Sequence, residues 1–131
     1  MIPHFNHFEI ILYVKDQQKS TAFYATLFRK EPDLNVPGMT EFILNDFCKL
    51  GLMPTEGIAK IITPNLPHPT TGNGIPRCEL YLSETDLENK LSICKKAGAK
   101  LISSIEPRNW GDTVFYISDF DGHVIAFASK A

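Results

Sequence analysis

The stretch that decides the fold is WGDTVFYISDFDGHVIAFASKA, which runs from Trp110 to Ala131. Two apolar runs, DTVFYIS and HVIAFA, lie on either side of the turn sequence DFDG. Strand-forming residues dominate both runs. Asp121-Gly122 can form the tight turn between them, because glycine accepts the left-handed backbone that such turns need. The stretch therefore predicts a strand–turn–strand hairpin.

The C-terminal half of the chain predicts a βαβββ order. Three further elements precede the hairpin: a strand at 78–84, a helix at 85–99 and a strand at 100–107. Either Thr85 or Asp86 can cap the start of the helix, and Gly98 can end it. Together with the hairpin, these elements complete one βαβββ module.

The N-terminal half repeats this order. The apolar sequence HFEIILYV predicts a strand, and Asp16 can cap the helix that follows it. Phe23 and Leu27 belong to the apolar stripe of that helix, and Pro32 is expected to stop it. Short strands are predicted in PDLNV, TEFILNDF and CKLGLM. The chain is therefore predicted to contain a structural repeat.

The predicted fold class is α+β, with two βαβββ modules forming curved mixed sheets around a cleft. The chain is predicted to be a single domain, with module one at about 6–53 and module two at about 77–129. The connector at about 54–76 holds five of the nine prolines and three of the eight glycines, which indicates a surface segment. A cleft between two small sheets is a natural place for a ligand.

Composition excludes several classes of partner. At 131 residues with 44% apolar residues, the chain can bury the core of one domain. A formal net charge of -2 argues against nucleic acid, and no apolar run approaches the roughly 20 residues that span a bilayer. The N-terminus shows no signal-peptide pattern, and the three cysteines form no C-x-x-C pair. A cytoplasmic protein with reduced thiols is expected.

Three stretches carry a family resemblance. EIILYVKDQQKSTAFYATLF, TDLENKLSICKKAGAKLI and WGDTVFYISDFDGHVIAFA resemble, in order, the opening strand and helix, the second-module helix and the closing hairpin of the vicinal oxygen chelate superfamily. That superfamily includes glyoxalase I, bleomycin-resistance proteins and extradiol dioxygenases. The resemblance implies a small-molecule ligand in the cleft and a homodimer.

The resemblance also assigns four positions to a metal. In metal-dependent members of the superfamily, four side chains, mostly His or Glu, meet in the cleft. Here these positions fall on Glu9, Gly51, Glu79 and Ala126. Gly51 and Ala126 have no side-chain donor, and a divalent ion needs several converging donors. No cofactor is therefore predicted, and a divalent metal is disfavoured.

The two remaining carboxylates are tentative catalytic residues. Glu9 and Glu79 each interrupt an apolar strand, and burial of a carboxylate shifts its pKa upward, which suits a general base or acid. Candidate ligand-binding residues come from aromatic side chains expected near the cleft and from a histidine on the Glu9 strand face: Tyr81, Trp110, Tyr116 and His7.

Three functional hypotheses follow. The first is a metal-free small-molecule-binding protein of the glyoxalase/bleomycin-resistance type. The second is a metal-dependent lyase or dioxygenase resembling glyoxalase I, and the third is a metal-free enzyme that uses Glu9 or Glu79 as general base. These hypotheses leave open whether the chain is an enzyme.

Overall fold

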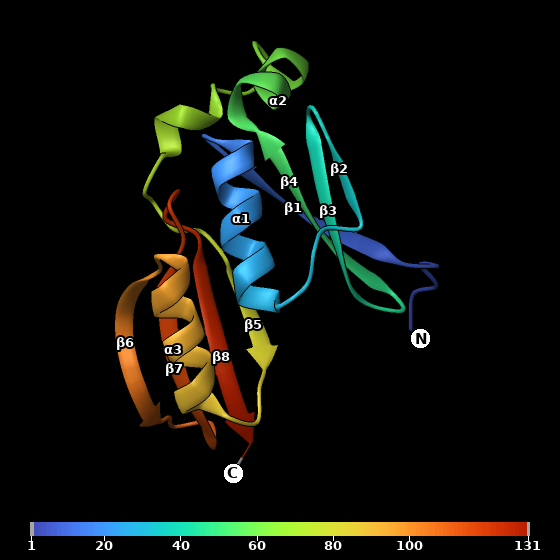
Figure 1. Cartoon of the computed structure of the whole chain (residues 1–131). Coiled ribbons are helices and arrows are strands. Elements are labelled where there is room, and N and C mark those ends of the chain that lie inside the picture. Colours follow the sequence, from blue (N-terminus) through green and yellow to red (C-terminus); the bar gives the residue numbers. More distant parts are fainter. Residues whose placement is uncertain (1, 131) are drawn as a thin grey trace. The chain divides into compact units, whose positions relative to one another are not determined.

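The computed structural model describes residues 2–130, and the chain is an α+β protein with the duplicated plan that the sequence predicts (Figure 1). The elements in chain order are β1 (Phe8–Val14), α1 (Gln17–Phe28), β2 (Leu34–Val36), β3 (Met39–Asn45), β4 (Cys48–Pro54), α2 (Thr55–Ile62), the short 3-10 turn η1 (Pro69–Gly72), β5 (Glu79–Ser83), α3 (Leu87–Ala97), β6 (Lys100–Pro107), β7 (Asp112–Ser118) and β8 (Val124–Lys130).

The two sheets have the same topology. The first has the strand order β1-β4-β3-β2, and the second has the equivalent order β5-β8-β7-β6. In each sheet the first strand of the module pairs in parallel with the last one, and the other pairings are antiparallel. In both modules, therefore, the closing strand lies between the opening strand and the strand before it.

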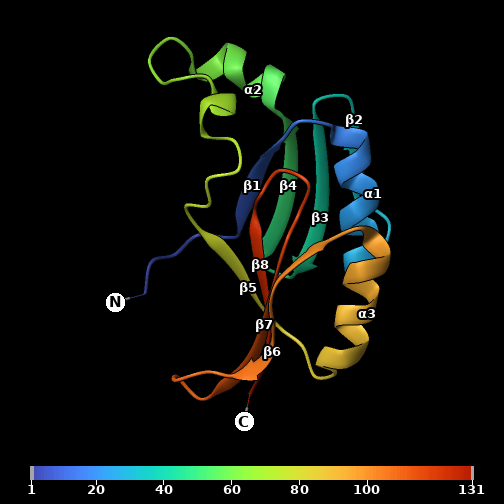
Figure 2. The same cartoon turned by 90° about the vertical axis from the view of Figure 1, so that its left-hand side faces the viewer.

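Each sheet buries one face in a core. In the first sheet, side chains of Leu12, Phe42 and Leu50 are buried, and α2 lies against β1 and β4. In the second sheet, Phe115 and Phe127 are buried in stacked contact, and α3 lies against β6, β7 and β8 (Figure 2). We call the opposite face of each sheet its open face, although the small residues at its centre, Gly51 in the first sheet and Ala126 in the second, are buried.

Helix boundaries follow local chemistry. Asp16 accepts a hydrogen bond from the backbone N–H of Lys19 at the start of α1, as predicted. The helix ends before Pro32, because Arg29 adopts a left-handed backbone with φ of 55°. For α3, Asp86 rather than Thr85 is the N-cap.

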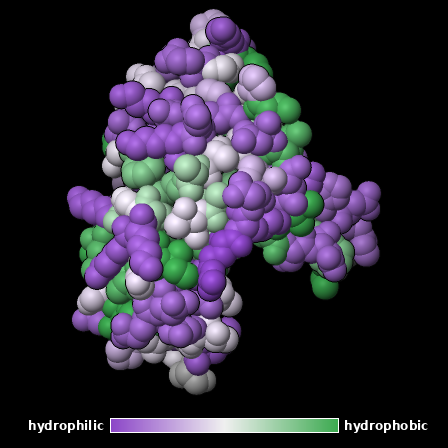
Figure 3. All heavy atoms as spheres, in the orientation of Figure 1, coloured by the Kyte–Doolittle hydropathy of each residue, from purple (hydrophilic) through white to green (hydrophobic). Residues whose placement is uncertain are grey.

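The chain divides into two compact units. The first contains the residues up to Thr21 together with Lys30–Thr71, and the second contains Ala22–Arg29 together with the chain from Gly72 onward. Helix α1 therefore contributes to both units. Figure 3 shows a surface on which hydrophilic residues predominate, with hydrophobic residues among them. Among the described residues, no helix has both the length and the apolar character needed to cross a membrane.

Candidate functional site

Gly51 occupies the centre of the first open face. It lies on β4, directly between Ile11 of β1 and Glu41 of β3. A Cβ atom added at Gly51 would collide with Oε2 of Glu9 and would lie 3.2 Å from Cγ1 of Ile11. The carboxyl group of Glu9 therefore fills the space that a side chain at position 51 would take.

The Glu9 carboxyl faces a second carboxyl group across this gap. Its Oε2 atom is buried and has no hydrogen-bond donor among the described residues. Glu41 is close enough to form a hydrogen bond with Glu9, which two carboxyl groups can do only when one of them carries a proton. Oε1 of Glu41 also lies 3.4 Å from Nζ of Lys49, as an ion pair. The contact therefore favours a proton on Glu9.

The electrostatics of Glu9 agree with this arrangement. Burial makes the largest contribution to raising its pKa, and the hydrogen bond and the charge of Glu41 raise it further. The charge of Lys49 acts in the opposite direction, and the resulting pKa of Glu9 is about 7. Glu9 can therefore change its protonation state near neutral pH, as a general acid or base must.

Exposed apolar side chains surround the carboxyl pair on the same face. Strand register places these residues on the side of Glu9 and Glu41, because directly paired residues share a face and alternate residues along a strand share one too. They are Ile11, Tyr13, Leu34, Val36 and Ile43. The first open face thus combines a titratable centre with an apolar rim.

The second open face has a different centre. Ala126 of β8 lies between Tyr81 of β5 and Tyr116 of β7. It is fully buried and forms a small apolar cluster with Val114 and Ala128, against which Tyr116 packs. No carboxyl group occupies this centre.

Beside Ala126, polar contacts fix the orientation of two exposed aromatic side chains. Nε1 of Trp110 donates a hydrogen bond to the hydroxyl of Tyr81 over 2.8 Å, and that hydroxyl donates to Oδ2 of Asp112 over 2.7 Å. Tyr81 is 42% exposed and Trp110 is 58% exposed. Their rings are therefore held in place while remaining accessible, and Asp112 adds negative charge beside them.

Tyr116, the third predicted aromatic residue, has a neighbour over its ring. The guanidinium of Arg108 lies 5.1 Å from the ring centre, within the range of a cation–π contact. Nη2 of Arg108 is held by Oγ of Ser103 and by the carbonyl oxygens of Ser104 and Val114. The guanidinium of Arg108 therefore covers one side of the Tyr116 ring.

The other two predicted residues lie outside these clusters. Glu79 is exposed at the first position of β5, and His7 is exposed immediately before β1. The residue that faces Glu9 is Glu41, which was not among the predicted site residues. Glu41 interrupts the apolar run TEFIL much as Glu9 interrupts HFEIILYV, but only the strand register shows that the two meet.

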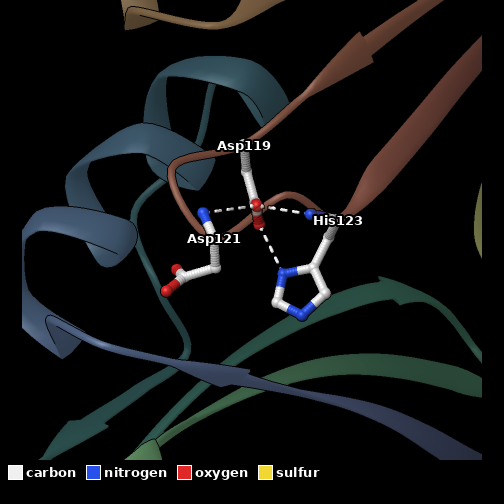
Figure 4. Close-up of side chains that lie close together, drawn as sticks. All are labelled: Asp119, Asp121 and His123. Atoms are coloured by element: carbon white, nitrogen blue, oxygen red, sulfur yellow. Dashed lines mark hydrogen bonds and ion pairs between the residues drawn. The ribbon is translucent and has the colours of Figure 1, made fainter. Parts of the chain in front are cut away.

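A further polar group lies in the β7–β8 turn. One ligand atom from each of Asp119, Asp121 and His123 lies within 4.8 Å of the others (Figure 4). The carboxylate of Asp119 already accepts hydrogen bonds from the hydroxyl of Tyr24 and from the backbone N–H groups of Asp121 and His123, and it contacts Nδ1 of His123 at 2.8 Å. These bonds shape the turn and attach it to α1.

Opposing effects set the pKa values of Asp119 and His123 in this turn. Burial raises the pKa of Asp119, but the hydrogen bonds and charge of His123 and the hydroxyl of Tyr24 outweigh burial and lower it. Burial lowers the pKa of His123, but its bond to Asp119 and the nearby negative charges outweigh burial and raise it. Asp119 is thus a satisfied ionised carboxylate, unlike Glu9.

The fold and the two open sheet faces define a duplicated βαβββ protein of the vicinal oxygen chelate class. The sequence matches the family described as "Glyoxalase-like domain" over residues 7–130, and the chain belongs to that family. The superfamily resemblance is therefore confirmed. A search of curated proteins gave no match.

Solved structures share the fold at low sequence identity. A glyoxalase-related enzyme from Fulvimarina pelagi is 19% identical with a TM-score of 0.78, and the match covers 93% of this chain and 86% of that chain. A glyoxalase/bleomycin resistance protein/dioxygenase family enzyme from Burkholderia phytofirmans PsJN is 12% identical with a TM-score of 0.79, over 94% and 97%. TioX from Micromonospora sp. ML1 is 14% identical with a TM-score of 0.68, over 95% and 98%. At these identities the matches show the fold alone.

The residues at the four family metal positions do not fit a four-ligand ion site. Gly51 and Ala126 offer no donor atom, and the space over Gly51 is filled by Glu9. Ala126 is enclosed in an apolar cluster. Each sheet therefore supplies a single carboxyl group from these positions, Glu9 in the first and Glu79 in the second.

Proposed function

We propose that the chain is a small-molecule-binding protein of the glyoxalase/bleomycin-resistance type that works without the four-residue metal site. The observation that supports this most directly is the centre of each open face. Gly51 and Ala126 provide no metal donor, and a carboxyl group or an apolar cluster occupies the surroundings of each. Binding by apolar and polar side chains is the function that these faces retain.

The exposed pair of Tyr81 and Trp110 is the proposed ligand surface. Their hydrogen bonds hold the rings before a ligand arrives, so little conformational entropy is lost on binding. The electron-rich faces of the rings and the carboxylate of Asp112 both attract positive charge. The surface therefore suits planar ligands, and cationic amphipathic ones in particular.

A thermal-shift screen with aromatic and cationic amphipathic compounds tests this binding function. A compound that binds only the folded chain raises its Tm. The expected result is a hit whose shift is lost in Trp110→Ala and retained in Phe47→Ala, a control that removes an exposed aromatic in the other unit. If no class of compound shifts the wild-type Tm, the binding proposal fails.

Titration with Ni(II), Zn(II), Mn(II) and Fe(II) tests the metal-free part of the proposal. Weak or absent binding is expected at the family positions. Tight one-to-one binding that Glu9→Gln abolishes would contradict the proposal. Binding lost only in His123→Gln would instead assign the ion to the β7–β8 turn.

A metal-free enzyme is the second candidate, and one observation favours it. The pKa of Glu9, raised to about 7 by burial and by Glu41, suits a group that accepts and donates protons near neutrality. For any reaction found with a bound compound, Glu9→Gln should abolish turnover. Glu79→Gln should retain turnover, because Glu79 lies exposed at the start of its strand. Activity that survives both substitutions would exclude this candidate.

The family resemblance also supports a homodimer. Analytical ultracentrifugation of the purified chain checks this, and a sedimentation coefficient of a monomer at all concentrations would contradict it. A cytoplasmic location remains a prediction from the sequence.

A further inference from the structure

Glu9 and Glu41 stand on strands on either side of β4 and meet above it. Register pairs Gly51 with Glu41 on one side and with Ile11 on the other, two residues beyond Glu9. A side chain on the middle strand would normally separate groups that reach across it. Because position 51 has no Cβ, the Glu9 carboxyl lies in the gap.

The contacts in the gap require a proton. Oε2 of Glu9 is buried and lacks a donor, and a buried carboxylate oxygen without a partner is costly. Glu41 is the group within hydrogen-bonding reach of Glu9, and two carboxylates repel unless one is neutral. Lys49 forms its ion pair with Glu41, so Glu9 is the member of the pair without a salt bridge of its own among the described residues.

We propose that Glu41 is a positioning residue that keeps a proton on Glu9, and that Gly51 provides the gap in which the two carboxyl groups meet. The pair then carries one proton between its members near neutral pH. This inference rests on the second proposed function, in which Glu9 moves a proton, and it names the residues that prepare Glu9 for that role.

The described titratable groups around the pair come from several elements. From β4, Lys49 forms an ion pair with Glu41. Burial and the charge of Glu9 both raise the pKa of Cys48, which is also on β4. From the chain before β1, His7 is exposed. From β2, the residue paired with Glu41 is Leu34, which is apolar. Lys49 is therefore the cation that acts on the pair.

The arrangement gives Glu9 a defined chemistry. While protonated, it can donate a hydrogen bond to an acceptor oxygen of a ligand on this face, and after ionisation it can accept one. The ligands expected to use Glu9 are those with a carbonyl or similar oxygen and an apolar body that contacts the exposed rim.

Carboxyl-carbon NMR of glutamate-labelled protein tests the proposal without any ligand. The Glu9 signal is assigned as the one missing in Glu9→Gln, and its titration midpoint is expected near the value of about 7 that the structure gives. In Glu41→Gln, the new amide donates to the Glu9 carboxylate, so the midpoint should fall by about one pH unit or more. In Lys49→Gln, the midpoint should rise, because a cation that favours ionisation is lost.

Two more variants complete the test. Gly51→Ala places a methyl group where Oε2 lies, so the carboxyl group must leave the gap and its midpoint should fall. If this variant does not fold by circular dichroism, Glu41→Gln decides alone. Glu79→Gln, in the other unit, should leave the midpoint unchanged. A wild-type midpoint near 4.5, or one unchanged by Glu41→Gln, would overturn the proposal.

The readout separates this inference from the proposed function. A normal Glu9 midpoint beside a clear ligand-induced rise in Tm would remove the shared proton and leave small-molecule binding intact. A raised midpoint that depends on Glu41, in a chain that shows no turnover, would support the proton sharing and leave the enzyme proposal without support.

Discussion

The open faces of the two sheets share a topology and differ at their centres. In the first sheet the central position is glycine, and Glu41 lies on its antiparallel side. In the second sheet the central position is Ala126, and tyrosines lie on both sides of it. The first centre is therefore titratable and the second is apolar.

Glu9 and Glu79 show what this difference does. Glu9 lies two residues before Ile11, the β1 residue that pairs with Gly51. Glu79 lies two residues before Tyr81, the β5 residue that pairs with Ala126. The two glutamates therefore occupy equivalent places in the two modules. Glu9 leans over Gly51 into a buried gap, whereas Glu79 stays exposed. The environment of a carboxyl group thus depends on the side chain of the neighbouring strand more than on its own place in the repeat.

The largest expected effect comes from placing a carboxyl group at the apolar centre. Ala126→Glu restores a donor at a family metal position, but the new charge would lie in a fully buried cluster of small side chains. We expect the free energy of unfolding to fall by about 3 kcal/mol or more, because an unpaired buried charge is costly. Urea unfolding measures this loss.

Ser83→Glu is the matched control for that substitution. Ser83 pairs with Ala128 on the same face and is exposed at the end of β5, so a charge there stays in water. If Ala126→Glu and the control have equal free energies of unfolding, water reaches the space around Ala126 and the new charge is not buried.

A second prediction contrasts the two buried carboxyl groups. Asp119 has donors on both oxygens, and Tyr24 supplies one of them from α1. Tyr24→Phe keeps the ring and removes the hydroxyl, leaving a buried carboxylate short of one donor. The expected loss is about 1–3 kcal/mol in urea unfolding, the usual cost of leaving a buried polar group unsatisfied. A loss within error of zero would mean that the other donors already satisfy Asp119.

A third prediction fills the gap above Gly51, at the centre of the first open face. Gly51→Ala forces the Glu9 carboxyl from its gap, which we expect to cost about 1–2 kcal/mol through overpacking. Glu9→Ala should remove that clash, so the double variant should be closer to Glu9→Ala alone than additivity predicts. Simple additivity in the double-mutant cycle would mean that Gly51 does not accommodate Glu9.

The fold could be predicted from sequence because its signals are local. Asp16 and Asp86 cap their helices, Gly98 ends α3, and each strand begins or ends within a few residues of its expected place. The end of α1 was expected from Pro32, but the left-handed backbone at Arg29 ends the helix earlier. A non-glycine residue in that conformation has no clear sequence signature.

The candidate site could be predicted only in part, because it depends on register. Tyr81 and Trp110 were expected near a ligand and do form a hydrogen-bonded pair. Glu41 was not among the predicted site residues, yet it lies beside Glu9, because the antiparallel pairing of β3 with β4 brings it there. From the sequence, Gly51 was interpreted as a family metal position without a donor. In the structure, its lack of a side chain also leaves room for the Glu9 carboxyl group, which lies on a neighbouring strand.

The smallest expected effect is the pH dependence of stability at Glu9. Its pKa is raised from the ordinary value of 4.5 to about 7 in the folded chain, so the folded state binds the proton more tightly than the unfolded state does. The stability contribution of the protonated group is fully present below pH 4.5 and is lost as the pH rises through 7.

Glu9→Gln has no such proton to lose. Its Tm relative to wild type should therefore rise between pH 5 and pH 8, by a modest amount because solvent reaches the group. Differential scanning calorimetry at both pH values measures the change, with Glu79→Gln as the variant expected to show none. A Tm difference that stays constant with pH would mean that Glu9 titrates alike in the folded and unfolded chain, and the contrast between the two centres would then be one of shape alone.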